Sequence, residues 1–81
     1  MAKSLHTPEY EYFCRLLTEA RESAGLTQTE VSAKLDRPQS FVAKYEGGER
    51  RLDVVEFIHI CTALGQDPHA ILNEMKQRVE P

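Results

Sequence analysis

Residues 27–46 read TQTEVSAKLDRPQSFVAKYE and contain the signals of two short helices with a break between them. Thr27 and Glu30 have the spacing of a capping box, in which a hydroxyl and a carboxylate each satisfy a free backbone amide at the start of a helix. Pro38 ends that helix early, because proline disfavours helical geometry in the residue before it, and proline can itself begin a helix. The stretch therefore predicts a second helix that runs from near Pro38 to Glu46, after a turn of about three or four residues.

The helix that follows Pro38 divides into an apolar half and a polar half. Glutamine, serine and lysine side chains can hydrogen-bond to base edges in the major groove of DNA, and a small alanine permits close approach. Two short helices with such an outer face are the outline of a DNA-binding helix-turn-helix. An ordinary amphipathic helix with a solvated polar side explains this segment about equally well when it is taken alone. At about 100° per residue, the inner half holds Phe41, Val42, Tyr45 and Glu46, and the outer half holds Gln39, Ser40, Ala43 and Lys44.

Three more helices are predicted around this stretch. The first follows Thr7 and ends at Gly25, and the last follows Asp67. The fourth follows Asp53, which has Glu56 three residues later in the spacing of a capping box, and ends at Gly65. Polar caps, proline at the first turn and glycine at the end mark these boundaries. With no strand predicted, residues 1–81 form one compact all-α domain of five helices, and the tail from Lys76 is expected to fray. The expected inner positions are Val54, Phe57, Ile58, Cys61 and Leu64 in the fourth helix, and the apolar positions of the last are Ile71, Leu72, Met75 and Val79.

The composition is that of a small folded protein, with 41% hydrophobic and 28% charged residues. No apolar run approaches the roughly 18 residues that span a bilayer, and the N-terminus lacks the apolar core of a signal peptide, so we expect a cytoplasmic protein. Cys14 and Cys61 are distant in sequence and share no metal-ligand spacing with His6, His59 and His69. We therefore expect two buried thiols, no metal and no cofactor. No spacing suggests a nucleophile with its base, so an enzyme is not predicted.

The charge is distributed unevenly along the chain. The net charge is −3, but residues 34–51 hold five basic and three acidic residues, a balance of +2, which leaves −5 for the remainder. A basic segment on an acidic body is compatible with a local surface that faces phosphate.

The run from Gly25 to Asp53 resembles the phage repressor/Cro-like (XRE) helix-turn-helix family, and the similarity extends over about residues 13–72. The most specific elements are Gly-Leu-Thr-Gln at 25–28, Glu-Gly at 46–47 and Ala-Leu-Gly at 63–65. The resemblance implies that the second and third helices form the helix-turn-helix and that the third enters the major groove of double-stranded DNA. It implies base contacts by Gln39, Ser40 and Lys44, and phosphate contacts by Gln28, Arg37, Arg50 and Arg51.

The resemblance also implies a structural ion pair between Arg21 and Glu46. Two positions depart from the family pattern. Asp36 stands in the turn where glycine is usual, and it tolerates a positive φ better than most residues. Glu49 stands where a basic residue is common. Both changes place an acidic side chain near the DNA side, so we expect modest non-specific affinity.

These observations predict a bacterial or phage-encoded, sequence-specific transcriptional regulator, most simply a homodimeric repressor on a palindromic operator. An antitoxin or a restriction-modification controller of the same fold is an alternative, with a toxin or RNA polymerase as protein partner. A protein-interaction module that has lost DNA binding is another, which the acidic balance favours. The dimer surface stays open between two groups of residues. One is Ile60, Ile71, Leu72, Met75 and Val79, and the other is Tyr10, Tyr12 and Phe13.

Overall fold

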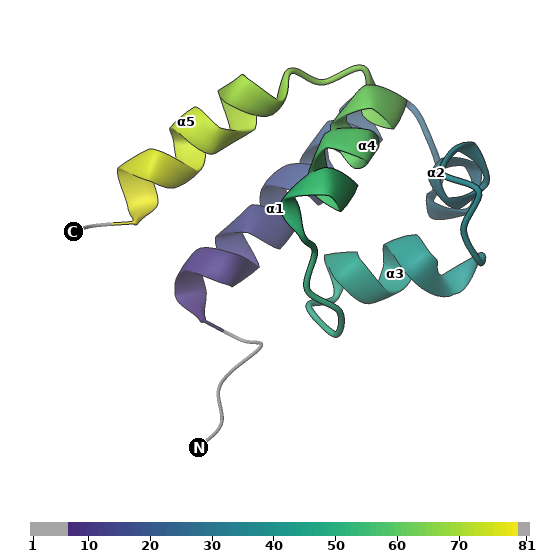
Figure 1. Ribbon diagram of the computed structural model, residues 1–81, viewed down its shortest axis with the longest axis horizontal. Coiled ribbons are helices and arrows are strands. Elements are labelled where there is room, and N and C mark those ends of the chain that lie inside the picture. The colour runs from purple at the N-terminus through teal and green to yellow at the C-terminus, as the bar shows by residue number, and fades with distance from the viewer. Residues whose placement is uncertain (1–6, 80–81) are drawn as a thin grey trace.

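A computed structural model describes residues 7–79, and within that range it contains five helices and no strand (Figure 1). The all-α five-helix fold predicted from the sequence is therefore confirmed. In Figure 1, α1 and α4 lie between α5 on one side and the α2–α3 pair on the other. The helices are α1 Pro8–Ser23, α2 Gln28–Lys34, α3 Ser40–Glu46, α4 Val54–Leu64 and α5 Pro68–Arg78.

Local side-chain caps decide where the helices begin. The Thr7 hydroxyl accepts a hydrogen bond from the Tyr10 amide at 3.1 Å. Complete capping boxes begin α2, at Thr27 and Glu30, and α4, at Asp53 and Glu56. Each cap satisfies backbone amides that the helix itself leaves unpaired. Because these residues lie within three positions of one another, the sequence alone was enough to predict both helix starts.

The turn between α2 and α3 has the left-handed residue that the sequence suggested. Asp36 has a φ of 56°, and the Arg37 amide donates to the Ser32 carbonyl at 3.0 Å. Aspartate is one of the few residues other than glycine that adopt this conformation at low cost. The turn therefore redirects the chain without a glycine and places α3 against α2.

The core forms where α1, α3 and α4 meet, and α2 and α5 close it at either side. Leu17, Val42 and Tyr45 are fully buried, and the Phe57 ring packs at a tilt against that of Phe13, with ring centroids 5.4 Å apart. Burying one such side chain contributes about 1.5–3 kcal/mol. This core fixes α3 by its inner half and leaves its outer half to solvent. The buried cluster consists of Leu17, Val31, Phe41, Val42, Tyr45, Phe57, Ile60, Cys61, Leu64 and Ile71.

Two predicted inner positions of α4 are wrong. Val54 and Ile58 are 66% and 46% exposed, whereas Ile60 is only 1% exposed. The buried arc of α4 is centred on Phe57 and Ile60, and Ile58 lies about 100° from Phe57 around the helix, so it faces outward. Val54 is the first residue of the helix and remains mostly exposed.

The apolar positions of α5 differ in burial. Ile71 is buried and Met75 is half-buried, while Leu72 and Val79 are about half exposed. The helix continues to Arg78, and fraying of the chain from Lys76 remains a prediction. Residues 80 and 81 lie outside the described range.

Both cysteines are buried free thiols, as predicted. The Cys14 thiol donates to the Tyr45 carbonyl at 3.2 Å. Between residues 7 and 79 no group of three or more His, Cys, Asp and Glu side chains is arranged to hold a metal ion. His6 lies outside the described residues. No helix in that part of the chain has both the length and the apolar character needed to cross a bilayer.

Candidate nucleic-acid interface

The two halves of α3 face in the directions that the sequence predicted. Phe41, Val42 and Tyr45 are buried, and Glu46 at the end of the helix is half-buried. The four predicted outer residues are all exposed, so three polar side chains and one alanine face solvent. That outer face consists of Gln39, Ser40, Ala43 and Lys44.

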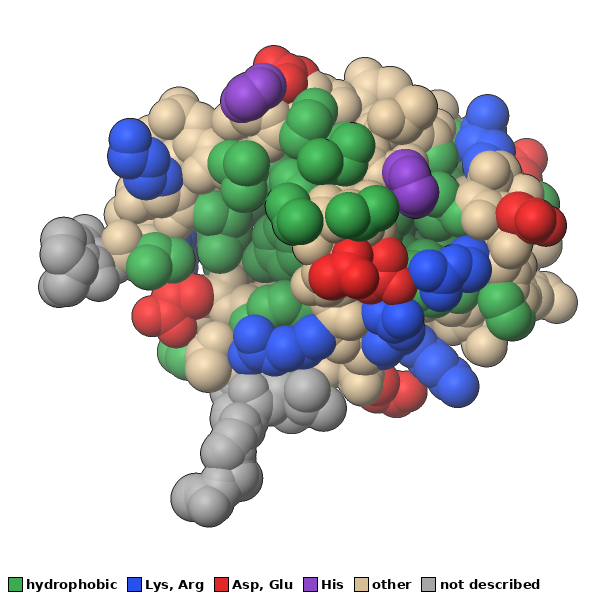
Figure 2. Space-filling view, viewed as in Figure 1, with side chains coloured by type: hydrophobic (Ala, Val, Ile, Leu, Met, Phe, Trp, Pro, Cys, Tyr) green, Lys and Arg blue, Asp and Glu red, His purple; other side chains and the backbone are tan. Residues whose placement is uncertain are grey.

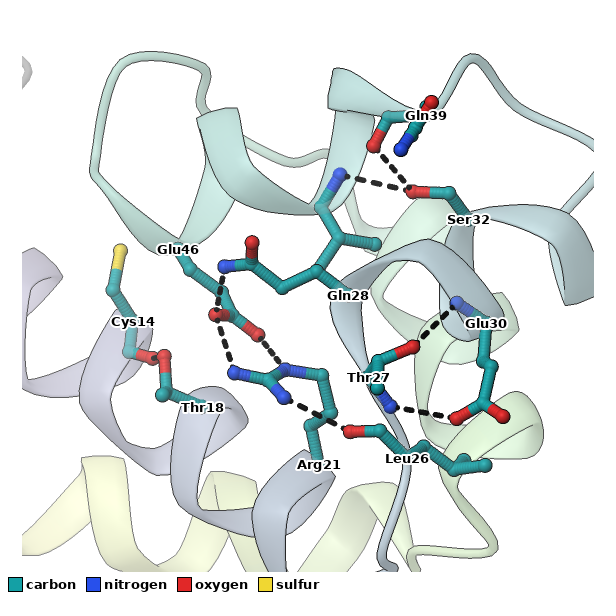
Figure 3. A network of polar contacts seen from close by, with 11 residues as sticks. Cys14, Thr18, Arg21, Leu26, Thr27, Gln28, Glu30, Ser32, Gln39 and Glu46 are labelled. Carbon is teal, nitrogen blue, oxygen red and sulfur yellow. Dashed lines mark hydrogen bonds and ion pairs between the residues drawn. The ribbon is translucent and has the colours of Figure 1, made fainter.

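A serine in α2 caps the N-terminus of α3. Among the described residues, Gln39 at the cap position makes no capping bond with its side chain. Instead the Ser32 hydroxyl accepts from the Val42 amide at 3.3 Å and donates to the Gln39 carbonyl at 3.2 Å (Figure 3). Ser32 is 1% exposed, so this bond is sheltered from water and joins the two helices. The sequence does not reveal this cap, because the capping residue lies outside the helix that it caps.

The Gln39 side chain is exposed but not free of contacts. Its amide nitrogen donates to the Thr29 hydroxyl at 3.3 Å. This long, exposed bond orients the Gln39 amide across the gap between α2 and α3. A weak bond of this kind exchanges readily for a stronger partner.

The C-terminus of α3 is tied to α1 by an ion pair between Arg21 and Glu46 (Figure 3). The contact is bidentate, with Nε–Oε2 at 2.7 Å and Nη2–Oε1 at 3.2 Å. Arg21 also donates from Nη1 to the Leu26 carbonyl at 2.9 Å. The two side chains are 13% and 6% exposed, and the bond to Glu46 is the main cause that raises the pKa of Arg21. The pair therefore links α1, the loop before α2 and α3.

Gln28 belongs to this network. Its side-chain nitrogen donates to Glu46 Oε1 at 2.9 Å, and the residue is half-buried. A phosphate contact by Gln28 remains a prediction. In this conformation the contact would come from the backbone at the start of α2, since the side-chain amide is directed toward Glu46.

Arg37 and Arg50 meet at the carboxylate of Glu56, which the sequence predicted only as a helix cap. Glu56 Oε2 lies 2.9 Å from Arg37 Nη2 and 2.7 Å from Arg50 Nη2. Glu56 Oε1 accepts from Arg50 Nη1 at 3.0 Å and from the Asp53 amide at 3.0 Å. These bonds, first of all the one from Arg50, lower the pKa of Glu56 to about 2. Arg51 instead lies over the Tyr10 ring, with 4.3 Å between its guanidinium carbon and the ring centroid.

A shallow hollow of about 220 Å³ lies between α3 and these arginines. Figure 2 shows Lys and Arg side chains gathered along the lower part of the molecule, where α3 and the loop after it lie, with acidic side chains beside them. The hollow brings four of the predicted DNA-contacting residues to one surface. Its lining is Arg37, Pro38, Ser40, Phe41, Lys44 and Arg50.

Comparison with known proteins agrees with this geometry. The family model of a helix-turn-helix domain matches residues 13–72. A solved structure named "XRE-family like protein from Pseudomonas syringae pv. tomato str. DC3000" is 49% identical, covers 89% of this chain and 88% of that chain, and superposes with a TM-score of 0.83. No curated protein matches the sequence.

Two short packed helices, the second with an exposed polar face, define a DNA-binding regulator of the helix-turn-helix class. Within that class, the chain belongs to the XRE-like helix-turn-helix family.

Proposed function

We propose that this regulator is a homodimeric repressor that binds a palindromic operator through the outer face of α3. The observation that carries the proposal is the exposed polar row of α3 beside a hollow lined by Arg37, Lys44 and Arg50. A recognition helix needs side chains that hydrogen-bond to bases and flanking cations that bind the backbone. The site of action would be the bacterial cytoplasm, where the DNA is.

The base contacts are assigned to Gln39, Ser40 and Lys44. Glutamine can bond to adenine N6 and N7 together, lysine to guanine O6 and N7, and serine to either a base or a phosphate. Ala43 lies exposed between them and lets the helix approach closely.

The phosphate contacts are assigned to residues on either side of the recognition helix. Arg37 precedes α3, and Arg50 and Arg51 follow it. The start of α2 at Gln28 supplies a further predicted contact. Contacts with the phosphate backbone supply affinity and salt dependence but little sequence information.

We assign the dimer contact to the exposed apolar residues of α4, with a second copy of this chain as the occupant. Val54, Val55 and Ile58 are 66%, 56% and 46% exposed. They lie in the half of α4 that follows the loop after α3, so an isologous contact there would keep both recognition helices near one two-fold axis, as half-sites about 34 Å apart require. Figure 2 shows hydrophobic side chains gathered in the middle of the face above the charged groups.

Both dimer surfaces predicted from the sequence are less available. In the first, Ile60 and Ile71 are 1% and 5% exposed. The second lies on α1, where the aromatic side chains pack within the chain. Phe13 packs on Phe57 with 5.4 Å between ring centroids. Tyr12 lies under the Arg78 guanidinium at 4.0 Å, and its hydroxyl donates to Glu74 at 3.3 Å. These aromatic groups are already engaged by other parts of the same chain.

Selection of bound duplexes from a random pool tests the function. The expected result is enrichment of a two-fold symmetric sequence. Lys44→Ala or Gln39→Ala should relax the preference at one or two base positions, at a cost of about 1–3 kcal/mol of discrimination. Arg51→Ala should weaken all sequences alike. A chain that retains no duplex even at low salt would contradict the proposal and support a protein-interaction module.

The oligomeric state tests the α4 surface separately. Ile58→Asp should dissociate the dimer, as measured by light scattering after size exclusion, and should weaken binding to the selected operator. Leu72→Asp is the matched control, because Leu72 on α5 is 49% exposed against 46% for Ile58. If Leu72→Asp dissociates the dimer and Ile58→Asp does not, the interface lies on α5.

One observation favours the interaction module as second candidate. Glu49 is exposed after α3, and Glu56 pairs with two of the predicted phosphate-binding arginines. Both carboxylates reduce the positive charge near the recognition helix. A toxin or RNA polymerase as the partner remains a prediction.

A further inference from the structure

We propose that Glu56 is a positioning residue for DNA binding, whose carboxylate holds Arg37 and Arg50 in the orientation that receives a backbone phosphate. This inference rests on the proposed function. Arg37 lies before α3 and Arg50 after it, and both side chains reach the same carboxylate in the first turn of α4. A residue outside the recognition helix thereby fixes the cations at both of its ends.

The contacts leave the two guanidinium groups available. Arg37 and Arg50 are 37% and 41% exposed, whereas Glu56 is 12% exposed. Arg37 donates one bond to Glu56, and Arg50 donates two to Glu56 and one to the Arg51 carbonyl. Since a guanidinium has five N–H donors, each arginine retains donors for a phosphate.

The ring of Phe41 supports both arginines from below. The guanidinium carbons of Arg37 and Arg50 lie 4.3 Å and 5.3 Å from its centroid, and Phe41 is 6% exposed and therefore fixed in the core. A planar cation stacks favourably on an aromatic face. The carboxylate and the ring together restrict each guanidinium in two directions.

Such restriction lowers the cost of binding. A free arginine side chain loses rotamer entropy when it is ordered. Two arginines that are already ordered in the free protein lose less when a phosphate binds, and preorganised groups bind more tightly for that reason. Glu56 is ionised at neutral pH, because the bonds from Arg50 and the Asp53 amide lower its pKa to about 2.

The charge of Glu56 has the opposite effect on affinity. A carboxylate beside the phosphate backbone repels it and cancels part of the positive charge of the arginines. If Glu56 only neutralises these arginines, its removal strengthens DNA binding. If it positions them, its removal weakens DNA binding although the protein becomes less acidic. The sign of the effect therefore decides between the two roles.

The experiment compares Glu56→Gln with Glu49→Gln, which makes the same charge change at an exposed residue after α3. Glutamine keeps an oxygen that can accept from the Asp53 amide, so the capping box is retained. It replaces the second oxygen by a donor, and the bonds from Arg37 Nη2 and Arg50 Nη2 are removed. The probe is a duplex of one arbitrary sequence, the same in every titration. Binding is measured by fluorescence anisotropy between about 50 and 200 mM salt.

We expect Glu56→Gln to weaken binding by about tenfold, since two ordered charge-assisted contacts are released. The slope of log affinity against log salt should become shallower by about 0.9 for each phosphate that the protein no longer neutralises. Glu49→Gln should bind as tightly as the wild type or more tightly. A Glu56→Gln protein that binds with equal or higher affinity, or with a steeper slope, overturns the inference.

A second comparison excludes a merely structural effect. In a chain that carries Arg37→Ala and Arg50→Ala, Glu56→Gln should not weaken binding further, because the groups through which it acts are gone. A further tenfold loss in that background overturns the inference. If Glu56→Gln does not fold, Glu56→Asp replaces it, since it keeps the charge but shortens the reach. We expect about threefold weaker binding from it, and unchanged affinity overturns the inference.

Failure of the proposed function gives a different result. A wild-type chain that binds no duplex at low salt refutes DNA binding and the role of Glu56 together. A wild-type chain that binds, with Glu56→Gln binding equally well, refutes the role of Glu56 alone.

Discussion

Arg21→Ala should destabilise the fold by about 3 kcal/mol, because it leaves a buried carboxylate without its cation. The substitution removes the bidentate contact with Glu46 and the bond to the Leu26 carbonyl. Glu46 is only 6% exposed, so water cannot replace the guanidinium fully. Losing one partner of a buried pair costs about 3–5 kcal/mol, and the low end applies here because Gln28 still donates to Glu46.

A loss of this size is large for a chain of 81 residues. Domains of this length have a free energy of unfolding of roughly 4–12 kcal/mol. One kcal/mol lowers the melting temperature by about 4–8 °C in this size range, so the expected decrease is about 12–24 °C. The assay is helical circular dichroism against temperature and against urea, without DNA. Binding to the selected operator, measured well below the melting temperature of the variant, should stay near that of the wild type.

Arg15→Ala is the control for this prediction. Arg15 lies exposed on the same helix, and within residues 7–79 it has neither an ion pair nor a side-chain hydrogen bond. Its substitution should change the free energy of unfolding by less than about 0.5 kcal/mol. The reasoning is refuted if Arg21→Ala melts at the wild-type temperature, or if Arg15→Ala lowers it by as much.

Four further predictions concern stability and reactivity. The bonds from Arg50 and the Asp53 cap lower the pKa of Glu56 from 4.5 to about 2, so its contribution to stability is complete above about pH 4.5 and is lost as the pH falls toward 2. Urea unfolding of Glu56→Gln should therefore depend less on pH in this window. Ser32→Ala should cost about 1–2 kcal/mol in the same assay, because the buried Val42 amide loses its acceptor. Tyr45→Phe should keep or raise stability by up to about 1 kcal/mol, since the buried Tyr45 hydroxyl has no hydrogen-bond partner among the described residues. Burial raises the pKa of the Cys14 thiol, and it raises the pKa of the Cys61 thiol to about 11. Iodoacetamide at about pH 8 should therefore label both thiols only after unfolding. Rapid labelling of the native protein would contradict this.

The parts of the structure that the sequence predicted are those decided by neighbouring residues. Two capping-box pairs, each three positions apart, predict helix starts, and the structure contains both. They are Thr27 with Glu30 and Asp53 with Glu56. Asp36 adopts the positive φ that its place in the turn requires. The division of α3 into two halves followed from helical geometry alone. In all of these cases the deciding contacts lie within one turn of helix.

The parts that the sequence could not predict depend on how separate helices pack. Ser32 caps a helix other than its own, and Glu56 collects arginines from 6 and 19 positions away. The sequence also does not predict that Ile60 is buried and Ile58 exposed. Both lie near the apolar side of α4, and only the neighbouring helices distinguish them. Each of these residues has a sufficient local explanation, as a surface serine, a cap or an apolar side chain. Nothing in the sequence required a second role.

The short length of α3 explains why so many of its supports come from elsewhere. It has seven residues, and isolated helices shorter than about 12–15 residues are only marginally stable in water. Its geometry is therefore imposed by Ser32 at the N-terminus, by Arg21 at the C-terminus and, through the flanking arginines, by Glu56. If α3 reads DNA as proposed, these three residues contact no base themselves. Their substitution should then change stability or overall affinity and leave the preferred sequence intact, whereas changes at Gln39 or Lys44 should alter the preferred sequence and leave stability intact.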